Sequence, residues 1–215
     1  MIRIVLVDDH ALVRSGFRMI LANEADLEIV GEAASGEEAL TLARSLKPDV
    51  MLMDVHLPGI SGLEATERLV RGDTGVRVIV VTAHEEQPFP RKLLEAGAAG
   101  YVTKACPAVE LVNAVREVAR GGKYLSSDVA RSLALASLPG RAPDSPFELL
   151  SARELEVAVK LARGDSMQDI AARLSLSPKT VATYKYRVFE KLGIENDVAL
   201  AHLAVQHRLL DSTVV

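Results

Sequence analysis

The 215-residue sequence predicts an α/β fold in which a doubly wound, five-stranded parallel sheet is followed by a small all-α domain of four helices. Over the first 120 residues, short apolar runs alternate with amphipathic stretches, a pattern typical of strands connected by helices. From Leu150 onward the pattern is purely helical, and a Pro-, Gly- and Ser-rich stretch lies between the two parts. We therefore expect one domain at residues 1–120, a linker with a short helix at 121–147, and a second domain at 148–212.

The strand candidates of the first domain are short apolar segments. Three of them contain the near-continuous runs IVLV, VMLM and VIVV, which suit strands that are buried on both faces of a parallel sheet. The five candidates are Ile2–Val7, Leu27–Gly31, Val50–Met53, Val76–Val81 and Gly100–Val102.

Each strand candidate is followed by a stretch in which apolar residues recur at helical spacing, as Leu12, Phe17, Ile20 and Leu21 do in the first. Five alternations of strand and helix predict right-handed crossovers. In such sheets the ligand site lies outside the carboxyl ends of the strands. The residues that follow each strand are therefore the candidates for a functional site.

The linker and the helical part carry their own start and stop signals. Gly121-Gly122 ends the fifth helix, and Ser126-Ser127-Asp128 predicts the start of a short helix through about Ser137. Four capping signals then predict four helices. They are Ser151 with Glu154, Ser166 with Asp169, Ser177 before Pro178, and Glu195-Asn196-Asp197.

Composition excludes several classes of protein. No run of about 18 uncharged apolar residues occurs, so we expect no transmembrane helix. The apolar N-terminal run reaches Asp8-Asp9 too early for a secretory signal. The single cysteine, Cys106, excludes an internal disulfide framework and a cysteine-based zinc site. A reducing cytoplasm is the expected location.

Charge is distributed unevenly along the chain. The net charge is −4, and residues 1–122 hold 13 Lys and Arg against 18 Asp and Glu. Residues 173–191, in contrast, hold five basic residues and one acidic residue. An acidic N-terminal part joined to a local basic stripe indicates a nucleic-acid partner for the C-terminal part.

Acidic residues follow two of the predicted strands. Asp8 and Asp9 stand at the end of the first strand, and Asp54 stands at the end of the third. Both ends lie at the same edge of a parallel sheet, where three carboxylates repel one another unless a cation or a proton lies among them. Hard oxygen ligands favour Mg²⁺ that is completed by waters and a phosphate. The sequence therefore predicts a magnesium site.

The remaining strands that reach this edge end in other polar groups. Thr82 ends the fourth strand, Ala83 beside it leaves the approach open, and Lys104 follows the fifth. This set is suited to phosphoryl transfer to a carboxylate. Asp54 would be the nucleophile, Asp9 and Asp54 would hold the metal, and Lys104 would pair with the phosphoryl oxygens. Any one of these residues alone would more often be a helix cap or a turn residue.

Two enzyme classes fit the sequence less well. A phosphatase of the haloacid-dehalogenase type needs a second aspartate two residues after the nucleophile, and this position is His56. A dinucleotide-binding enzyme needs a Gly-x-Gly-x-x-Gly turn after the first strand, and the turn from Asp8 to Gly16 lacks those glycines.

The helices predicted at 166–174 and 177–192 have helix-turn-helix spacing. In the second helix Val181, Tyr184, Val188 and Leu192 should pack inward. The outward face should comprise Lys179, Ala182, Thr183, Tyr186, Arg187 and Lys191. Bases would be contacted by Ala182, Thr183 and Tyr186, and phosphates by Lys179, Thr180, Lys185, Arg187 and Lys191. An ordinary amphipathic helix with a solvated basic face is the alternative.

Residues 1 to about 120 resemble the receiver domain of two-component response regulators. The motifs are Asp8-Asp9, Asp54 with Leu57-Pro58-Gly59, Thr82-Ala83 and Lys104-Ala105-Cys106-Pro107. The resemblance implies a flavodoxin-like fold and phosphorylation of Asp54 by a histidine kinase. It also implies Mg²⁺ bound by Asp8, Asp9, Asp54 and the backbone carbonyl of His56.

The same resemblance implies a switch in which Thr82 moves toward the phosphoryl group and Tyr101 turns inward. From its position alone, an aromatic residue on the last strand is as readily part of the core. Two residues separate Lys104 from Pro107, which leaves the isomer of the peptide bond before Pro107 open.

The C-terminal part contains four short motifs, namely Leu150-Ser151-x-Arg153-Glu154-x-Glu156-Val157, Ile170-Ala171-x-x-Leu174, Ser177-x-x-Thr180-Val181 and Lys191-Leu192. On these motifs it resembles the LuxR-type helix-turn-helix, so that the whole chain resembles a regulator of the NarL/FixJ type. Segments 85–90, 144–147 and 183–192 are similar to the GacA/UvrY branch.

That branch implies a transcription regulator, not an enzyme, that activates small regulatory RNA genes under a hybrid sensor kinase. Phosphorylation would favour a homodimer on double-stranded DNA. The apolar surplus of the last helix makes it a candidate contact between the two copies, and packing within its own domain is the alternative. Ala182 departs from the larger polar residue expected there, which leaves the exact DNA sequence open. A regulator that is controlled by a protein partner, independently of phosphorylation, is the alternative function.

Overall fold

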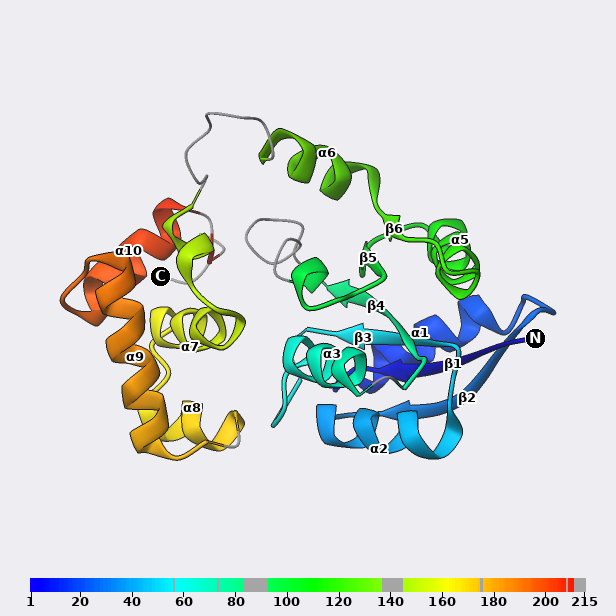
Figure 1. The fold of residues 1–215 in the computed structure, drawn as a ribbon, viewed down its shortest axis with the longest axis horizontal. Coiled ribbons are helices and arrows are strands. Elements are labelled where there is room, and N and C mark those ends of the chain that lie inside the picture. Colours follow the sequence, from blue (N-terminus) through cyan, green and yellow to red (C-terminus); the bar gives the residue numbers. More distant parts are fainter. Residues whose placement is uncertain are drawn as a thin grey trace. The chain divides into compact units, whose positions relative to one another are not determined.

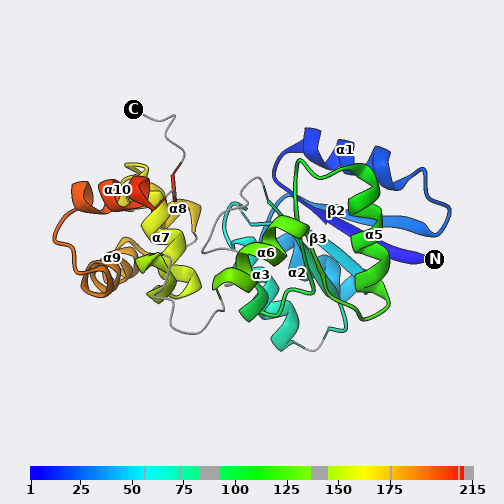
Figure 2. The ribbon, with the colours of Figure 1, turned by 90° about the horizontal axis from the view of Figure 1, so that it is seen from above.

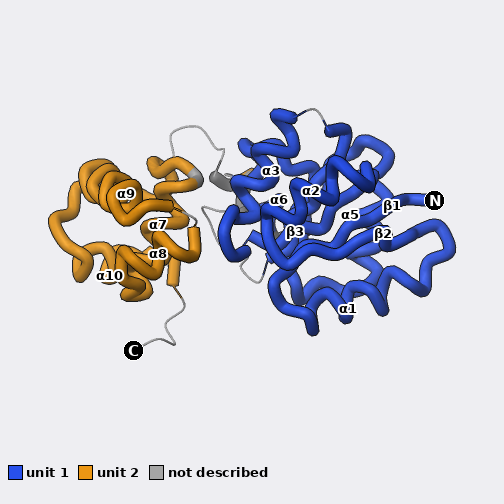
Figure 3. The backbone as a smooth tube through the Cα atoms, turned by 90° about the horizontal axis from the view of Figure 1, so that it is seen from below, with its two compact units in different colours: residues 1–85, 93–131 blue, residues 86–92, 132–215 orange. Residues whose placement is uncertain are grey.

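The computed structural model describes residues 1–55, 57–72, 74–82, 93–136, 145–174, 176–207 and 209–210. They form two compact units, whose boundary in the chain lies between Arg131 and Ser132 (Figure 3). No described helix is both long and apolar enough to cross a bilayer.

The first unit is built on a parallel sheet, to which the described residues contribute six strands in the order β2-β1-β3-β4-β5-β6 (Figure 1). All paired strands are parallel. The strands are β1 (Ile2–Val7), β2 (Leu27–Ala33), β3 (Val50–Asp54), β4 (Arg77–Thr82), β5 (Gly100–Thr103) and β6 (Tyr124–Leu125). The predicted fold class is confirmed.

The sheet has one strand more than the five predicted. β6 has only two residues, Tyr124 and Leu125. It pairs with β5 through the Tyr124 N–H, which donates to Ala99, and the Ser126 N–H, which donates to Tyr101. Two residues are too few to produce an apolar run or an alternation, so sequence periodicity does not reveal this edge strand.

Helices cover both faces of the sheet (Figure 2). Helices α2 and α3 contact each other on one face of the sheet. Helices α1 and α5 contact each other on the opposite face, where their apolar side chains join a large cluster of buried hydrophobic residues. Of the predicted fourth helix, residues 93–95 are helical and residues 96–97 form a turn, while residues 83–92 lie outside the described part of the chain. The helices of this unit are α1 (Ala11–Leu21), α2 (Gly36–Leu46), α3 (Gly62–Arg71) and α5 (Ala108–Ala119). Helix α6 (Ser127–Ala136) contains the boundary between the two units.

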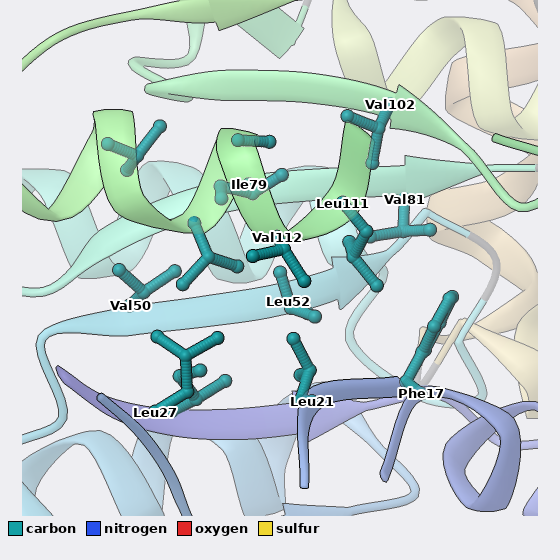
Figure 4. Close-up of a cluster of buried hydrophobic side chains, with 14 of the residues drawn as sticks. Phe17, Leu21, Leu27, Val50, Leu52, Ile79, Val81, Val102, Leu111 and Val112 are labelled. Carbon is teal, nitrogen blue, oxygen red and sulfur yellow. The ribbon is translucent and has the colours of Figure 1, made fainter. Parts of the chain in front are cut away.

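Figure 4 shows the core between the sheet and the α1–α5 face, where Leu21, Leu52 and Val112 meet. The alternate residues of the same strands, such as Met51 and Met53 of β3, are buried as well. Because both faces of the sheet are covered, each central strand is apolar along its length, as the sequence pattern predicts.

The second unit is helical. Its elements are the 3-10 helix η1 (Pro146–Leu149), α7 (Ala152–Ala162), α8 (Met167–Arg173), α9 (Pro178–Leu192) and α10 (Asp197–Gln206). The predicted N-caps Ser151, Ser166, Ser177 and Asn196 each accept a hydrogen bond from a backbone N–H of the first turn. The predicted capping box of Ser151 and Glu154 is complete.

Candidate functional site

The register of the sheet brings the predicted polar residues to one edge. Val7 pairs with Met53, Asp54 pairs with Val81, and Thr82 pairs with Thr103. Asp8 follows β1 directly, and Lys104 follows β5. Neighbouring strands therefore end at nearly the same level, and the polar side chains of Asp8, Asp9, Asp54 and Lys104 gather there in a cluster that we call the acidic pocket.

Lys104 connects the two buried carboxylates of this pocket. Its Nζ lies 2.7 Å from Asp8 Oδ2 and 2.9 Å from Asp54 Oδ2. Asp8 and Asp54 are only 2% and 3% exposed. Two carboxylates so far from water need a counter-charge, and the Lys104 ammonium supplies it.

Two opposing effects act on the Lys104 ammonium. Burial lowers the pKa of Lys104, but the hydrogen bonds to Asp8 and Asp54 outweigh burial and hold this pKa above its usual range. The backbone N–H of Lys104 donates to the Thr82 carbonyl at 2.7 Å, which ties the end of β5 to the end of β4. Lys104 is therefore a fixed positive charge at the pocket edge.

Asp9 and His10 form the exposed side of the pocket. His10 Nδ1 lies 2.7 Å from Asp9 Oδ1, and the His10 backbone N–H donates to Asp8 Oδ1 at 2.8 Å. One ligand atom from each of Asp8, Asp9, His10 and Asp54 lies within 4.8 Å of all the others. His10 was missed by the sequence reasoning, although its place next to the acidic pair was a signal.

The donor set fits a hard divalent cation. Three carboxylates, those of Asp8, Asp9 and Asp54, lie close together, and the Lys104 ammonium contacts two of them, Asp8 and Asp54. Carboxylate oxygens in small number are typical ligands of Mg²⁺, which keeps part of its water shell. The predicted ligand His56 and the predicted neighbour Ala83 lie outside the described residues.

The backbone packs tightly behind Asp54. A Cβ atom at Gly62 would lie 1.7 Å from the Asp54 carbonyl oxygen, and the Gly62 N–H donates to the Val55 carbonyl at 3.0 Å. Ser61 caps α3 at this point. Gly62 is thus a second site-related residue that the sequence reasoning missed, because periodicity does not reveal a backbone contact.

Thr82 and Tyr101 are both buried. Tyr101 is among the largest fully buried side chains and pairs with Val80 of β4. Its place agrees with the interpretation of Tyr101 as a core residue. Its role in a switch stays a prediction, as does that of Thr82.

In the second unit, α9 presents the two faces that were predicted. Val181 and Val188 are buried, and Tyr184 and Leu192 are half-buried. The six residues expected to face outward are all exposed, namely Lys179, Ala182, Thr183, Tyr186, Arg187 and Lys191. The DNA contacts of this face stay predictions.

Two of the predicted phosphate contacts also hold the helical unit together. Lys185 Nζ lies 2.6 Å from Asp197 Oδ2 and 5.2 Å from the centroid of the Phe189 ring. Lys191 Nζ lies 2.7 Å from Glu154 Oε2. These pairs join α9 to α10 and to α7.

Two hydroxyls of α9 are engaged as well. Thr180 Oγ1 lies 2.8 Å from the hydroxyl of the N-cap Ser177, and Thr183 Oγ1 donates to the Lys179 carbonyl at 3.0 Å. The side chains of Tyr186 and Arg187, in contrast, extend from the exposed face of the helix.

Comparisons with known proteins agree with both units. The model of the response regulator receiver domain matches residues 4–116, and the model of bacterial regulatory proteins of the luxR family matches residues 148–204. The chain belongs to the response regulators. It combines a receiver domain with a LuxR-type helix-turn-helix domain, as the sequence motifs indicate.

Full-length relatives place this response regulator in the GacA/UvrY branch. It is 51% identical over 212 residues to the response regulator GacA of Pseudomonas aeruginosa, with 99% of each chain covered. It is 45% identical to the response regulator UvrY of Escherichia coli K12, with 99% of this chain and 97% of the relative covered.

A structure of the RcsB response regulator of Salmonella typhimurium is 25% identical, with a TM-score of 0.76, and covers 96% of this chain and 98% of RcsB. Another structure shows two RcsB dimers bound to two parallel DNAs, with 26% identity, a TM-score of 0.60, and 95% of this chain and 98% of RcsB covered. Together the two domains make this response regulator a DNA-binding transcription regulator and not an enzyme.

Proposed function

We propose that this response regulator accepts a phosphoryl group on Asp54 from a histidine kinase and converts it into a change in promoter binding. The contact that carries the proposal is the bridge from Lys104 to both buried carboxylates, Asp8 and Asp54. Side chains that meet in this way at the ends of β1, β3 and β5 would bind a doubly charged group and its counter-ions.

The chemistry assigned to Asp54 is nucleophilic. One carboxylate oxygen attacks the phosphorus of a phosphohistidine, the P–N bond breaks, and an acyl phosphate forms on Asp54. Lys104 then exchanges part of its contact with Asp54 for the phosphoryl oxygens. We assign Thr82 to a hydrogen bond with the same oxygens, and Ala83 to an open approach. Tyr101 would respond to the movement of Thr82.

The residues assigned to Mg²⁺ are Asp8, Asp9 and Asp54, with the backbone carbonyl of His56 completing the set. When bound, Mg²⁺ neutralises charge on the phosphoryl oxygens. The chain itself orients the ligands: the His10 N–H fixes Asp8, and the tight packing of Gly62 on the Asp54 carbonyl fixes the end of β3.

We assign DNA binding to the exposed face of α9. Ala182, Thr183 and Tyr186 would reach base edges in the major groove, and an alanine contacts only a thymine methyl there. Lys179 and Arg187 are exposed and would contact phosphates. Thr180, Lys185 and Lys191 would join them after exchanging the partners that they have within the domain.

Dimerisation would couple the phosphorylation of Asp54 to DNA binding by α9. Val198 and Val205 of α10 are 79% and 48% exposed, which makes α10 a candidate contact between two copies. RcsB binds DNA as dimers. Two recognition helices related by a two-fold axis would match a two-fold symmetric DNA site.

We assign the target genes from the similarity to relatives, and the domain boundaries from the sequence. By its similarity to the GacA/UvrY branch, we assign activation of small regulatory RNA genes under a hybrid sensor kinase. The receiver would occupy residues 1–120, the linker 121–147 and the DNA-binding domain 148–212. Because the proposed target is DNA, we assign the action of this regulator to the cytoplasm.

Phosphorylation of the purified full chain with acetyl phosphate tests the assignment of Asp54. We expect a phosphoprotein on a phosphate-affinity gel with Mg²⁺, and none after EDTA or in Asp54→Asn. Glu28→Gln, which removes an exposed carboxylate of β2, is the control and should be phosphorylated like the wild type. Equal phosphorylation of Asp54→Asn would contradict the assignment.

A further inference from the structure

Arg14 of α1 lies beside the acidic pocket and holds its backbone. Its Nη1 donates to the backbone carbonyl of Asp8 at 2.6 Å, and its Nε donates to Glu32 Oε2 at 3.1 Å. The Arg14 side chain is largely buried, with 18% exposed. One guanidinium therefore connects α1, the end of β1 and the neighbouring strand β2.

The hydrogen bond from Arg14 to the Asp8 carbonyl orients the peptide between two residues of the pocket. The Asp8 carbonyl belongs to the peptide unit that joins Asp8 to Asp9. This unit is planar, so the direction of its carbonyl also sets the direction of the Asp9 N–H. The Asp8 N–H donates to Ala33 at 3.2 Å, and Asp8 Oδ1 accepts the His10 N–H at 2.8 Å. Arg14 holds the peptide between these two points.

Glu32 supplies a firm anchor for Arg14. It lies in β2, where it pairs in register with Leu6 of β1, so the sheet fixes its backbone. The fork of an arginine can donate to Glu32 and to the Asp8 carbonyl at once, whereas a lysine has a single nitrogen. The residue type and its two partners together fix one orientation of the peptide.

Arg18 offers a natural comparison. It pairs with the other carboxylate oxygen of Glu32, one helical turn further along α1 than Arg14. Loss of Arg18 therefore weakens the same anchor without removing the donor to the Asp8 carbonyl. The two arginines separate an effect on the pocket from an effect on the packing of α1 against β2.

We infer that Arg14 is a positioning residue of the acidic pocket: it fixes the peptide between Asp8 and Asp9, and so holds the Asp9 carboxylate where a divalent cation binds. This inference rests on the proposed function and adds a residue that touches neither the cation nor the phosphoryl group. Loss of a group that orients a metal ligand typically lowers metal affinity 10- to 100-fold.

Titration of Mg²⁺ into the full chain by calorimetry tests this role. We expect Arg14→Ala to bind Mg²⁺ about tenfold more weakly than the wild type. Arg14→Lys should recover part of the loss, and the control Arg18→Ala should stay within about twofold of the wild type, because it leaves the Asp8 carbonyl contact in place. Melting temperatures in EDTA show whether each variant is folded.

The outcomes are distinct. A folded Arg14→Ala that binds Mg²⁺ as tightly as the wild type overturns the inference, and so does an equal loss in Arg18→Ala. If Arg14→Ala does not fold, Arg14→Lys decides in the same way, because unchanged affinity there overturns the role of the fork. A wild type without Mg²⁺ affinity would instead contradict the proposed function, and the inference with it.

Discussion

The acidic pocket and the recognition helix α9 place charge in opposite ways. The pocket takes side chains from the ends of three strands, buries Asp8 and Asp54, and balances their charge with Lys104. Helix α9 takes its charges from one element and exposes Lys179 and Arg187. Buried charges depend on one another, so a single change should alter the stability of the receiver. Exposed charges act almost independently, so a single change should alter binding alone.

The largest effect is expected where the pocket backbone is tightest. Gly62→Ala would place a Cβ 1.7 Å from the Asp54 carbonyl oxygen, so the loop must shift. We expect a loss of at least about 3 kcal/mol in the free energy of unfolding, measured by urea denaturation. Gly16→Ala is the control. Gly16 lies in α1, and a Cβ atom there would have no neighbouring atom within 4 Å besides the backbone of its own helix. An equal response of both variants would contradict this account of the pocket.

A smaller loss is expected when the buried counter-charge is removed. Lys104→Met leaves Asp8 and Asp54 buried without their shared cation. We expect the free energy of unfolding in EDTA to fall by about 2 kcal/mol, and Mg²⁺ to restore part of it. Lys123→Met, at an exposed position, should change little. A Lys104→Met protein as stable as the wild type in EDTA would refute the dependence on Lys104.

Two basic residues of α9 should behave differently from each other. Lys191→Met removes the ion pair with the buried Glu154, and we expect about 1 kcal/mol less protection of α7 amides in hydrogen exchange. Arg187→Ala should leave that protection unchanged, but weaken DNA binding and lower the salt dependence by about one counter-ion. The assignment would be contradicted if Arg187→Ala lowered the protection of α7 amides and Lys191→Met left it unchanged.

The smallest effect is one of pH. Burial raises the pKa of Glu154, but the hydrogen bond from Lys191 and those with Ser151 outweigh it, and this pKa lies below its usual range. Glu154 therefore stabilises the folded domain above the pKa of an unfolded glutamate, about 4.3, and this contribution is lost as the pH falls through the lower, folded value. The difference in α7 protection between wild type and Lys191→Met should shrink from pH 7 to pH 3. A constant difference would exclude this ion pair as its source.

The two regions also differ in what the sequence could reveal. Apolar runs predicted the strands, and because parallel strands share an edge, the convergence of Asp8, Asp54 and Lys104 followed from chain order alone. Gly62 and Arg14 were missed, because each acts on a backbone carbonyl that no periodicity reports. The two-residue strand β6 was missed for lack of length.

In α9, helical spacing predicted which residues are exposed, and the structure agrees. Spacing did not predict that Lys185 and Lys191 pair with Asp197 and Glu154. Those partners come from α10 and α7, so their nearness depends on how the helices pack. The sequence thus predicts which basic residues lie on the exposed face of a helix. It does not predict which of them form ion pairs within the domain and which remain available to DNA.

DNA binding by the purified full chain tests the central claim most directly. Wild type and Asp54→Ala would be titrated onto promoter DNA of a small regulatory RNA gene, with and without Mg²⁺ and acetyl phosphate. The account predicts tighter binding only for wild type with both additions, since only that sample carries the phosphoryl group on Asp54. Equal binding in all samples would contradict it, and would favour a DNA-binding protein that is controlled by a protein partner.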